Sequence, residues 1–334
     1  MVAELSLDDD RLFPPDPTTR HLARRIYATT RQLPIISPHG HVPASWIARD
    51  ESFDNPTKLL LTPDHYIFRL LHANGVEPSD LGVGRTEPLT EAENRRAFRI
   101  FCEHWTDFNG TAMRYWLTDQ LVGIFGVRLR PSAETADAIY DAIAEKLTSP
   151  DFRPRALMDA FNIAFLATTD DPCDDLHFHE QISRDADFAA RHRIVPTFRP
   201  AKYLEPARPD WNDLVDALGV AADVDTATYA GFVEAMHRRR AYFQAHGAVS
   251  TDHAHLDLES IVLPEDEAAR LYDAARRRRG TQQDYLTLRR HLFTQQAMLA
   301  AQDGLTMTVH PAAHRNHDVA SFASYGPDTG SDIP

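Results

Sequence analysis

Cysteine is scarce in this chain, because its 334 residues contain only Cys102 and Cys173. Two cysteines cannot build a disulfide framework, so we exclude a small disulfide-stabilised secreted fold and expect a reducing cytoplasm. Long apolar runs are also missing, since no stretch approaches the roughly 20 residues that a membrane span needs. The first residues are acidic where a secretory signal would be basic and then apolar, which again favours a cytoplasmic protein.

Basic residues are also fewer than acidic residues. Lysine and arginine together number 35 against 49 acidic residues, which gives a formal net charge of −14. Such a chain is not attracted to a nucleic-acid backbone or to an anionic membrane, so we expect neither as a partner. A small anionic substrate remains compatible with this charge, because a few arginines in one pocket can hold a carboxylate.

Five short apolar runs are typical of buried strands: residues 33–37, 161–169, 193–198, 247–251 and 305–310. Each run ends in a polar cluster, and helical patterns separate most of the runs. Strands that alternate with helices predict an α/β fold with a parallel sheet. Polar residues after every strand are typical of a (β/α)8 barrel, whose functional site lies at the carboxyl ends of its strands.

One interval breaks this alternation, since about 120 residues separate the first two runs, far more than an ordinary connection needs. Their patterns are helical, with Thr90 and Glu93 spaced as a helix cap. We therefore predict a barrel domain of residues 1–42 and 156–334 and a helical insertion of residues 43–155. Five strands do not close a barrel and leave two unpaired edges, so we expect a piece of a longer protein that lacks the C-terminal strands.

Histidine is present in pairs separated by one residue. The 17 histidines of the chain would give about one such pair by chance, whereas the sequence has three: His39/His41, His177/His179 and His253/His255. A pair is therefore weak evidence by itself, and its position in the predicted fold must decide its meaning.

The first pair, His39 and His41, follows the first predicted strand. In extended chain alternate side chains share a face, so the two imidazoles can bind one metal ion. The alternative is that both are solvated loop histidines.

The second pair, His177 and His179, opens a predicted helix, where the side chains of residues two apart point in different directions. In the third pair, His253 is nearest to a strand end and is a candidate for the site. Asp170, after the second strand, is interpreted as a cap of the next helix.

Several longer motifs carry a family resemblance. They are "PHGH", "PDHYIFRLLHANGV", "LATTDDPCDDLHFHEQI", "VPTFRPAKYL", "STDHAHL", "VHPAAHRNH" and "YGPDTGSD". In order and spacing they resemble the uronate isomerases of the amidohydrolase superfamily, from about residue 30 to the end of the chain. The resemblance implies a distorted (β/α)8 barrel with a helical insertion after the first strand. It also implies conversion of glucuronate to fructuronate and of galacturonate to tagaturonate.

The resemblance assigns roles to individual residues. Together with the reasoning above it gives this expected set: metal ligands His39 and His41; catalytic residues His65, Tyr66 and His310; substrate-binding residues Arg199, Arg315 and His253. The expected cofactor is a divalent metal ion, Zn or Mn, and the expected assembly is a homo-oligomer. This chain departs from the family at Pro311 and His314. It also lacks the family's third metal ligand, an aspartate after the eighth strand.

Aldose–ketose isomerisation moves a proton between C2 and C1, which requires a base and an electrophile that holds the enediolate oxygen. We expect His65 and Tyr66 to close over the barrel mouth as part of a lid. Two alternatives stay open at this point. One is a metal-dependent hydrolase of the same superfamily, although Lys202 is the only lysine near a predicted strand end. The other is an inactive, truncated sugar-acid-binding protein.

Overall fold

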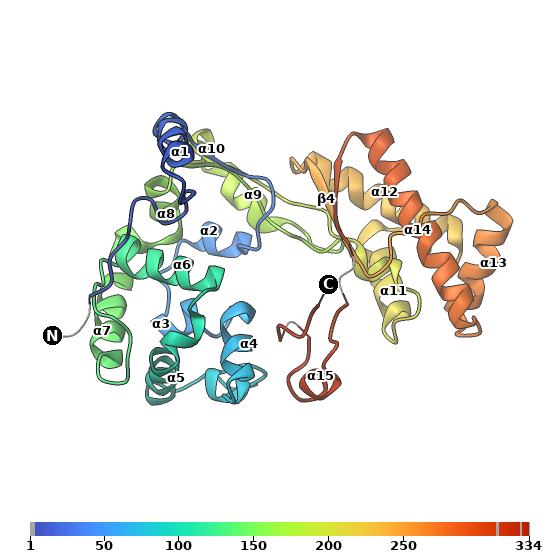
Figure 1. Ribbon diagram of the computed structural model, residues 1–334. Coiled ribbons are helices and arrows are strands. Elements are labelled where there is room, and N and C mark those ends of the chain that lie inside the picture. Colours follow the sequence, from blue (N-terminus) through green and yellow to red (C-terminus); the bar gives the residue numbers. More distant parts are fainter. Residues whose placement is uncertain (1–3, 312–313, 328, 334) are drawn as a thin grey trace. The chain divides into compact units, whose positions relative to one another are not determined.

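The computed structural model describes residues 4–311, 314–327 and 329–333, whose helices and strands are labelled in Figure 1. The chain divides into two compact units. Unit 1 comprises residues 1–33, 50–162 and 315–333, and unit 2 comprises residues 34–49 and 163–314. The division departs from the predicted boundaries, because the first 33 residues and residues 315–333 belong with the helical part. Residues 43–49, predicted to begin the insertion, belong to the unit that holds the strands.

Unit 1 is helical, as the sequence patterns predicted for its central part. Its helices and helical turns are α1 (Pro17–Thr30), α3 (Pro56–Leu60), α4 (His65–Ala73), η1 (Pro78–Leu81), α5 (Glu91–Glu103), η2 (Trp105–Phe108), α6 (Ala112–Asp119), the π-helical η3 (Gln120–Ile124), α7 (Ala136–Leu147), η4 (Pro150–Phe152), α8 (Pro154–Ala160) and α15 (Val319–Tyr325). Helix α15 joins this unit through the Tyr325 hydroxyl, which donates to the Glu77 carboxylate at 3.0 Å.

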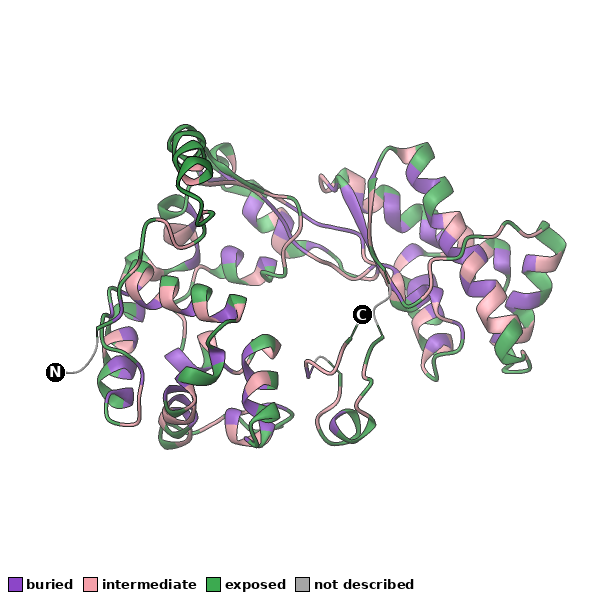
Figure 2. Cartoon of the chain, viewed as in Figure 1, coloured by how far each residue is buried: buried purple, intermediate pink, exposed green. Residues whose placement is uncertain are grey.

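Helix α5 shows how the sequence determines this unit locally. Thr90 and Glu93 form the predicted capping box, which satisfies backbone donors at the start of the helix. The apolar residues Phe98, Phe101 and Cys102 recur on one face of the helix and lie in the buried core of unit 1. Helix α1 differs, since none of its residues is buried, and Figure 2 shows it exposed along its length.

Unit 2 contains the strands and the helices between them. Its elements are β1 (Ile35–Ser37), α2 (Ala44–Arg49), β2 (Ile163–Ala167), α9 (His177–Arg184), α10 (Ala186–Arg191), β3 (Arg193–Val195), η5 (Ala201–Leu204), α11 (Trp211–Ala222), α12 (Tyr229–Ala245), β4 (Ser250–His255), α13 (Glu265–Arg276), α14 (Gln282–Asp303) and β5 (Thr306–Pro311). All five strands fall where the sequence predicted them, within a few residues at each end.

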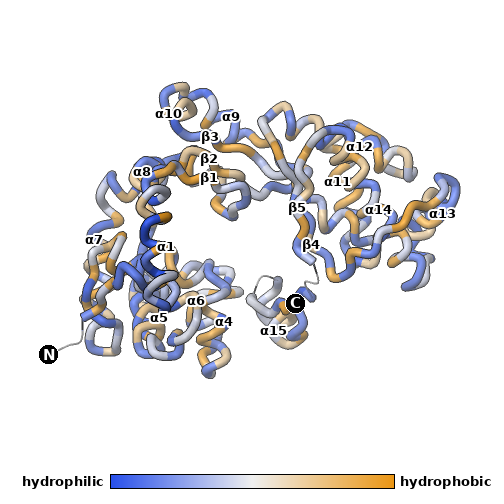
Figure 3. Tube along the Cα trace, turned by 45° about the horizontal axis from the view of Figure 1, so that its top comes forward, coloured by the Kyte–Doolittle hydropathy of each residue, from blue (hydrophilic) through white to orange (hydrophobic). Residues whose placement is uncertain are grey.

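The strands are parallel and follow chain order. Strands β1, β2 and β3 form one sheet and β4 pairs with β5 in another. A single bridge between Phe198 and Thr251 links the end of β3 to β4. Figure 3 shows β1, β2 and β3 side by side, with hydrophobic residues along them. Parallel order brings the carboxyl ends of consecutive strands to one edge, which is where the polar clusters were predicted to gather.

The core of unit 2 lies among the helices that follow β3. Trp211, Phe232, Phe243 and Tyr272 are fully buried there and come from α11, α12 and α13. The buried faces of α11, α12 and α14 are visible in Figure 2. Among the described residues, no helix combines the length and the apolar composition that crossing a lipid bilayer requires.

Candidate functional site

The carboxyl ends of the five strands carry a row of polar side chains. His39 follows β1, Asp170 follows β2 and Arg199 follows β3, while Asp252 and His310 lie within β4 and β5. All five residues belong to unit 2. These five side chains therefore lie at or near the strand ends, where the sequence predicted a site, and their roles there stay predictions.

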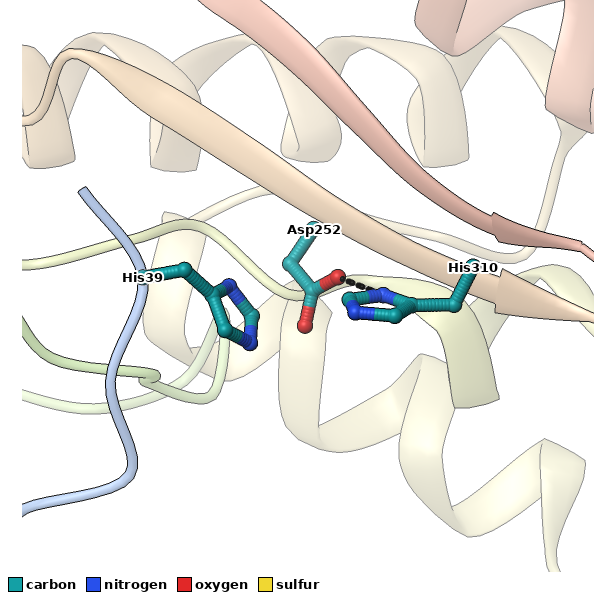
Figure 4. A group of neighbouring side chains, drawn as sticks. All are labelled: His39, Asp252 and His310. Atoms are coloured by element: carbon teal, nitrogen blue, oxygen red, sulfur yellow. Dashed lines mark ion pairs between the residues drawn. The ribbon is translucent and has the colours of Figure 1, made fainter. Parts of the chain in front are cut away.

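Three of these side chains converge on one point. His39, Asp252 and His310 each offer one donor atom, and these atoms all lie within 4.8 Å of one another. Figure 4 shows the Asp252 carboxylate between the two imidazoles. The rings of His39 and His310 are 5.1 Å apart, centroid to centroid. Register explains this meeting, because His310 lies opposite Ala254, which points to the same face of β4 as Asp252.

Asp252 is the buried centre of the group, with none of its side chain exposed. Its two oxygens lie 2.8 Å from Nδ1 of His310 and 3.3 Å from Nε of Arg199. Neither contact has the geometry of a hydrogen bond, so among the described residues both oxygens lack a hydrogen-bond donor. The buried carboxylate therefore rests on ion-pair contacts without hydrogen bonds, and a bound metal cation would stabilise it further.

His41 faces His39, and their Nε2 atoms are 3.2 Å apart. Burial lowers the pKa of His41, and the nearby positive charge of Arg199 lowers it further. A lowered pKa keeps the imidazole neutral near pH 7, which is the form that binds a metal ion. Two imidazoles with facing nitrogens are a suitable pair of ligands for one divalent cation.

These residues fit a divalent metal ion. The site combines the facing nitrogens of His39 and His41, a third imidazole in His310, and the unsatisfied carboxylate of Asp252. Nitrogen and carboxylate donors of this kind suit Zn and related ions. The donor set and the buried anionic oxygens therefore agree with a metal, which the sequence predicted from the first histidine pair.

His253 does not belong to this group, so its predicted place at the strand end was wrong. Strand β4 runs on to His255, and His253 therefore lies inside it, fully buried. Its ring packs against Phe293 of α14, on the opposite face of β4 from Asp252. The alternation of "TDHAH" would have identified Asp252, had the predicted strand not stopped at residue 251.

Within the described part of the chain, His177 and His179 share no hydrogen-bond partner, as predicted for two such residues at the start of a helix. His177 Nδ1 contacts the Asp175 carboxylate, whereas the buried His179 bonds Thr168 through Nε2. Asp170, however, is no helix cap. Its Oδ2 accepts hydrogen bonds from the Thr168 hydroxyl and from the backbone N–H of Thr197, so it ties the end of β2 to the chain after β3. Burial raises the pKa of Asp170 to about 6.

The remaining predicted residues lie in unit 1. His65 and Tyr66 open helix α4, with their rings 4.3 Å apart, and Asp64 provides the cap. Arg315 forms an ion pair with Asp332. The roles of these residues at the strand ends of unit 2 stay predictions.

Comparison with known proteins identifies relatives along almost the whole chain. The model of the glucuronate isomerase family matches residues 18–334. A uronate isomerase of Cutibacterium acnes is 60% identical over 330 residues, which are 99% of this chain and 70% of that protein. A uronate isomerase of Rhizobium meliloti is 41% identical over 329 residues, or 98% of this chain and 70% of that protein.

Solved structures agree with the sequence matches. The glucuronate isomerase of Caulobacter crescentus superposes with a TM-score of 0.94 at 36% identity, over 99% of this chain and 68% of that one. The uronate isomerase of Thermotoga maritima gives a TM-score of 0.89 at 25% identity, over 98% of this chain and 69% of that one.

Proposed function

We infer the function of this chain from one premise, which is that it belongs to the glucuronate isomerase family. It is an isomerase of hexuronates, which interconverts D-glucuronate with D-fructuronate and D-galacturonate with D-tagaturonate. The observation in the structure that best supports this function is the convergence of His39, Asp252 and His310 beside Arg199. That group places cation-binding and proton-carrying side chains next to a guanidinium suited to a carboxylate.

The proposed architecture is a distorted (β/α)8 barrel, to which the five parallel strands of unit 2 contribute. Chain-order parallel strands with polar residues at their carboxyl ends support it. Residues 43–155 are proposed as a helical insertion that closes the mouth as a lid, carrying His65 and Tyr66. The first helical turn of α4 supports this role, since it presents both side chains together.

The proposed cofactor is a divalent cation, Zn or Mn, held by His39 and His41 with Asp252 as the nearby anionic group. When bound, such an ion polarises the carbonyl and hydroxyl oxygens of an open-chain sugar. The protein's own part is to hold the two imidazoles with their Nε2 atoms facing each other. Burial and the charge of Arg199 favour the neutral form of His41, whose pKa they lower.

Arg199 is proposed to bind the uronate carboxylate. Its Nε forms an ion pair with the Asp252 carboxylate at 3.3 Å, and its side chain is 31% exposed. An anchored guanidinium can present its terminal N–H groups to a carboxylate in a bidentate manner. Arg315 is a second proposed contact, although its guanidinium is engaged by Asp332 in the present arrangement.

His310 is proposed to move the proton between C2 and C1. Its Nδ1 lies against the buried carboxylate of Asp252, while half of its side chain is exposed. The contact with Asp252 occupies Nδ1 and leaves Nε2 as the ring nitrogen that can exchange a proton with the substrate. His65 and Tyr66 are proposed to relay the hydroxyl protons of the substrate from the lid.

A hydrolase of the same superfamily is the competing function. Such sites often use a lysine that bridges metal ions, and Lys202 is the lysine nearest to the strand ends of unit 2. Its Nζ instead pairs with Asp171 at 2.6 Å, so it is engaged in a local ion pair. This engagement, together with family membership, favours isomerisation.

The test is an assay of purified protein with D-glucuronate and D-galacturonate, beside generic esters and lactones as controls. We expect ketose formation from the uronates, loss of activity after chelation, and recovery with Zn²⁺ or Mn²⁺. In D₂O, proton transfer through a base predicts deuterium uptake from solvent. Hydrolysis of the control substrates without ketose formation would refute the proposal. Sedimentation of the same sample tests the proposed homo-oligomer, and fractionation of source cells tests the proposed cytoplasmic location.

A further inference from the structure

The loop that carries His39 and His41 is held in place from the neighbouring strand. The Thr169 hydroxyl donates to the backbone carbonyl of Gly40 at 2.8 Å. Gly40 is the residue between the two histidines, so a bond to its carbonyl acts on both side chains at once. Thr169 lies two residues beyond the end of β2, in the same unit.

The register of the sheet brings these two residues together. Ser37 of β1 pairs with Leu166 of β2. Gly40 lies three residues after Ser37, and Thr169 lies three residues after Leu166. The two chains therefore stay in the same register beyond the strands, which places the Thr169 hydroxyl beside the Gly40 carbonyl. The Ser37 hydroxyl also donates to the His39 carbonyl at 3.3 Å. Two hydroxyls therefore hold two consecutive carbonyls of the metal-binding loop.

Close packing adds to this restraint. A Cβ on Gly40 would lie 3.2 Å from the carbonyl oxygen of Ala167 and 3.2 Å from a methyl carbon of Leu166. Both distances are shorter than ordinary van der Waals contact, so the glycine lets the loop lie directly on the end of β2. The loop is thus fixed by shape on one side and by the Thr169 hydrogen bond at its centre.

We propose that Thr169 is a positioning residue that holds the backbone between His39 and His41, so that their Nε2 atoms face each other for a metal ion. The inference rests on the proposed metal site and deepens it. Without the hydroxyl, the Gly40 carbonyl loses its partner and the two imidazoles no longer keep their 3.2 Å spacing. Groups that orient metal ligands in this way typically change metal affinity 10–100-fold when they are removed.

Thr169→Val keeps the shape of the side chain and removes the hydroxyl, while Thr169→Ser keeps the hydroxyl. Thr226→Val is a matched control, because the Thr226 hydroxyl bonds a buried carbonyl, that of Val215, in the helical layer of unit 2. The measurement is the dissociation constant of Zn²⁺, from competition with a chromophoric chelator. We expect an increase of about tenfold or more for Thr169→Val, near wild-type affinity for Thr169→Ser, and no change for Thr226→Val.

A second measurement separates this inference from the metal proposal. The imidazole NMR shifts of His39 and His41 in metal-free protein should change in Thr169→Val and return in Thr169→Ser. Unchanged shifts together with unchanged Zn²⁺ affinity would overturn the role of Thr169, as would an equal loss of affinity in the Thr226→Val control. If the wild-type protein binds no Zn²⁺ or Mn²⁺, the proposed cofactor fails, and the imidazole shifts alone decide the role of Thr169.

Discussion

Asp252→Asn should change the stability of this protein differently with and without metal. The substitution keeps the shape of the side chain and removes a charge that is fully buried. In metal-free protein, Arg199 and His310 can be hydrated in place of the lost ion pairs, because 31% and 51% of their side chains are exposed. The variant also escapes the cost of burying a carboxylate, so we expect the free energy of unfolding to change by no more than about 1 kcal/mol.

With saturating Zn²⁺ the variant should lose stability relative to the wild-type protein. A 10–100-fold weaker metal affinity removes about 1.4–2.8 kcal/mol of the stabilisation that the ion gives the folded state. The assay is urea unfolding of both proteins, in EDTA and in excess Zn²⁺. Equal stabilisation of both proteins by Zn²⁺ would refute the placement of Asp252 beside the metal. A loss of about 3 kcal/mol or more in EDTA would show instead that the carboxylate is a structural partner.

Four further outcomes are expected. His39→Ala and His41→Ala should lower metal content and activity together, and full occupancy by elemental analysis would exclude the pair as ligands. Arg199→Lys should raise KM for uronates with little change in melting temperature, because lysine keeps the charge but loses the bidentate geometry. Asp170→Asn should be more stable than wild type above pH 6, by up to about 3 kcal/mol. Since the folded pKa of Asp170 is raised from 3.8 to about 6, its favourable contribution is lost as pH rises through 6, and the advantage of asparagine should vanish in urea titrations near pH 4. A substrate-bound crystal structure should place His65 within hydrogen-bond reach of the sugar, and a separation beyond roughly 10 Å from the His39 ring would contradict the lid.

Local sequence patterns were sufficient to predict the strands, because each is a short apolar run that a polar cluster follows. The same patterns identified His39 and His41 as candidate residues after the first strand, whereas Arg199 and His310 were singled out by the family resemblance. Asp252 was missed for a local reason, since placing the end of β4 four residues early turned a strand residue into a loop residue.

No local sequence pattern marked the residues at which one unit ends and the other begins. Residues 315–333 join unit 1 through contacts such as the hydrogen bond from Tyr325 to Glu77, which spans 248 residues of sequence. Asp170 was read as a cap because aspartate after a strand often caps the next helix. Its actual partner, the backbone N–H of Thr197, follows a different strand. Contacts of this kind depend on the order of strands in the sheet and not on the spacing of residues along the chain.

The two hydrophobic cores give this chain two natural fluorescence reporters. Trp105 is buried in the core of unit 1 and Trp211 in the core of unit 2. A core that excludes water as a separate cluster tends to unfold as its own cooperative step. In a protein whose exposed Trp46 and Trp116 are also replaced by phenylalanine, replacing either buried tryptophan would leave the emission of the other to follow its own unit. Metal binding at the strand ends of unit 2 would then delay the Trp211 transition and leave that of Trp105 where it was.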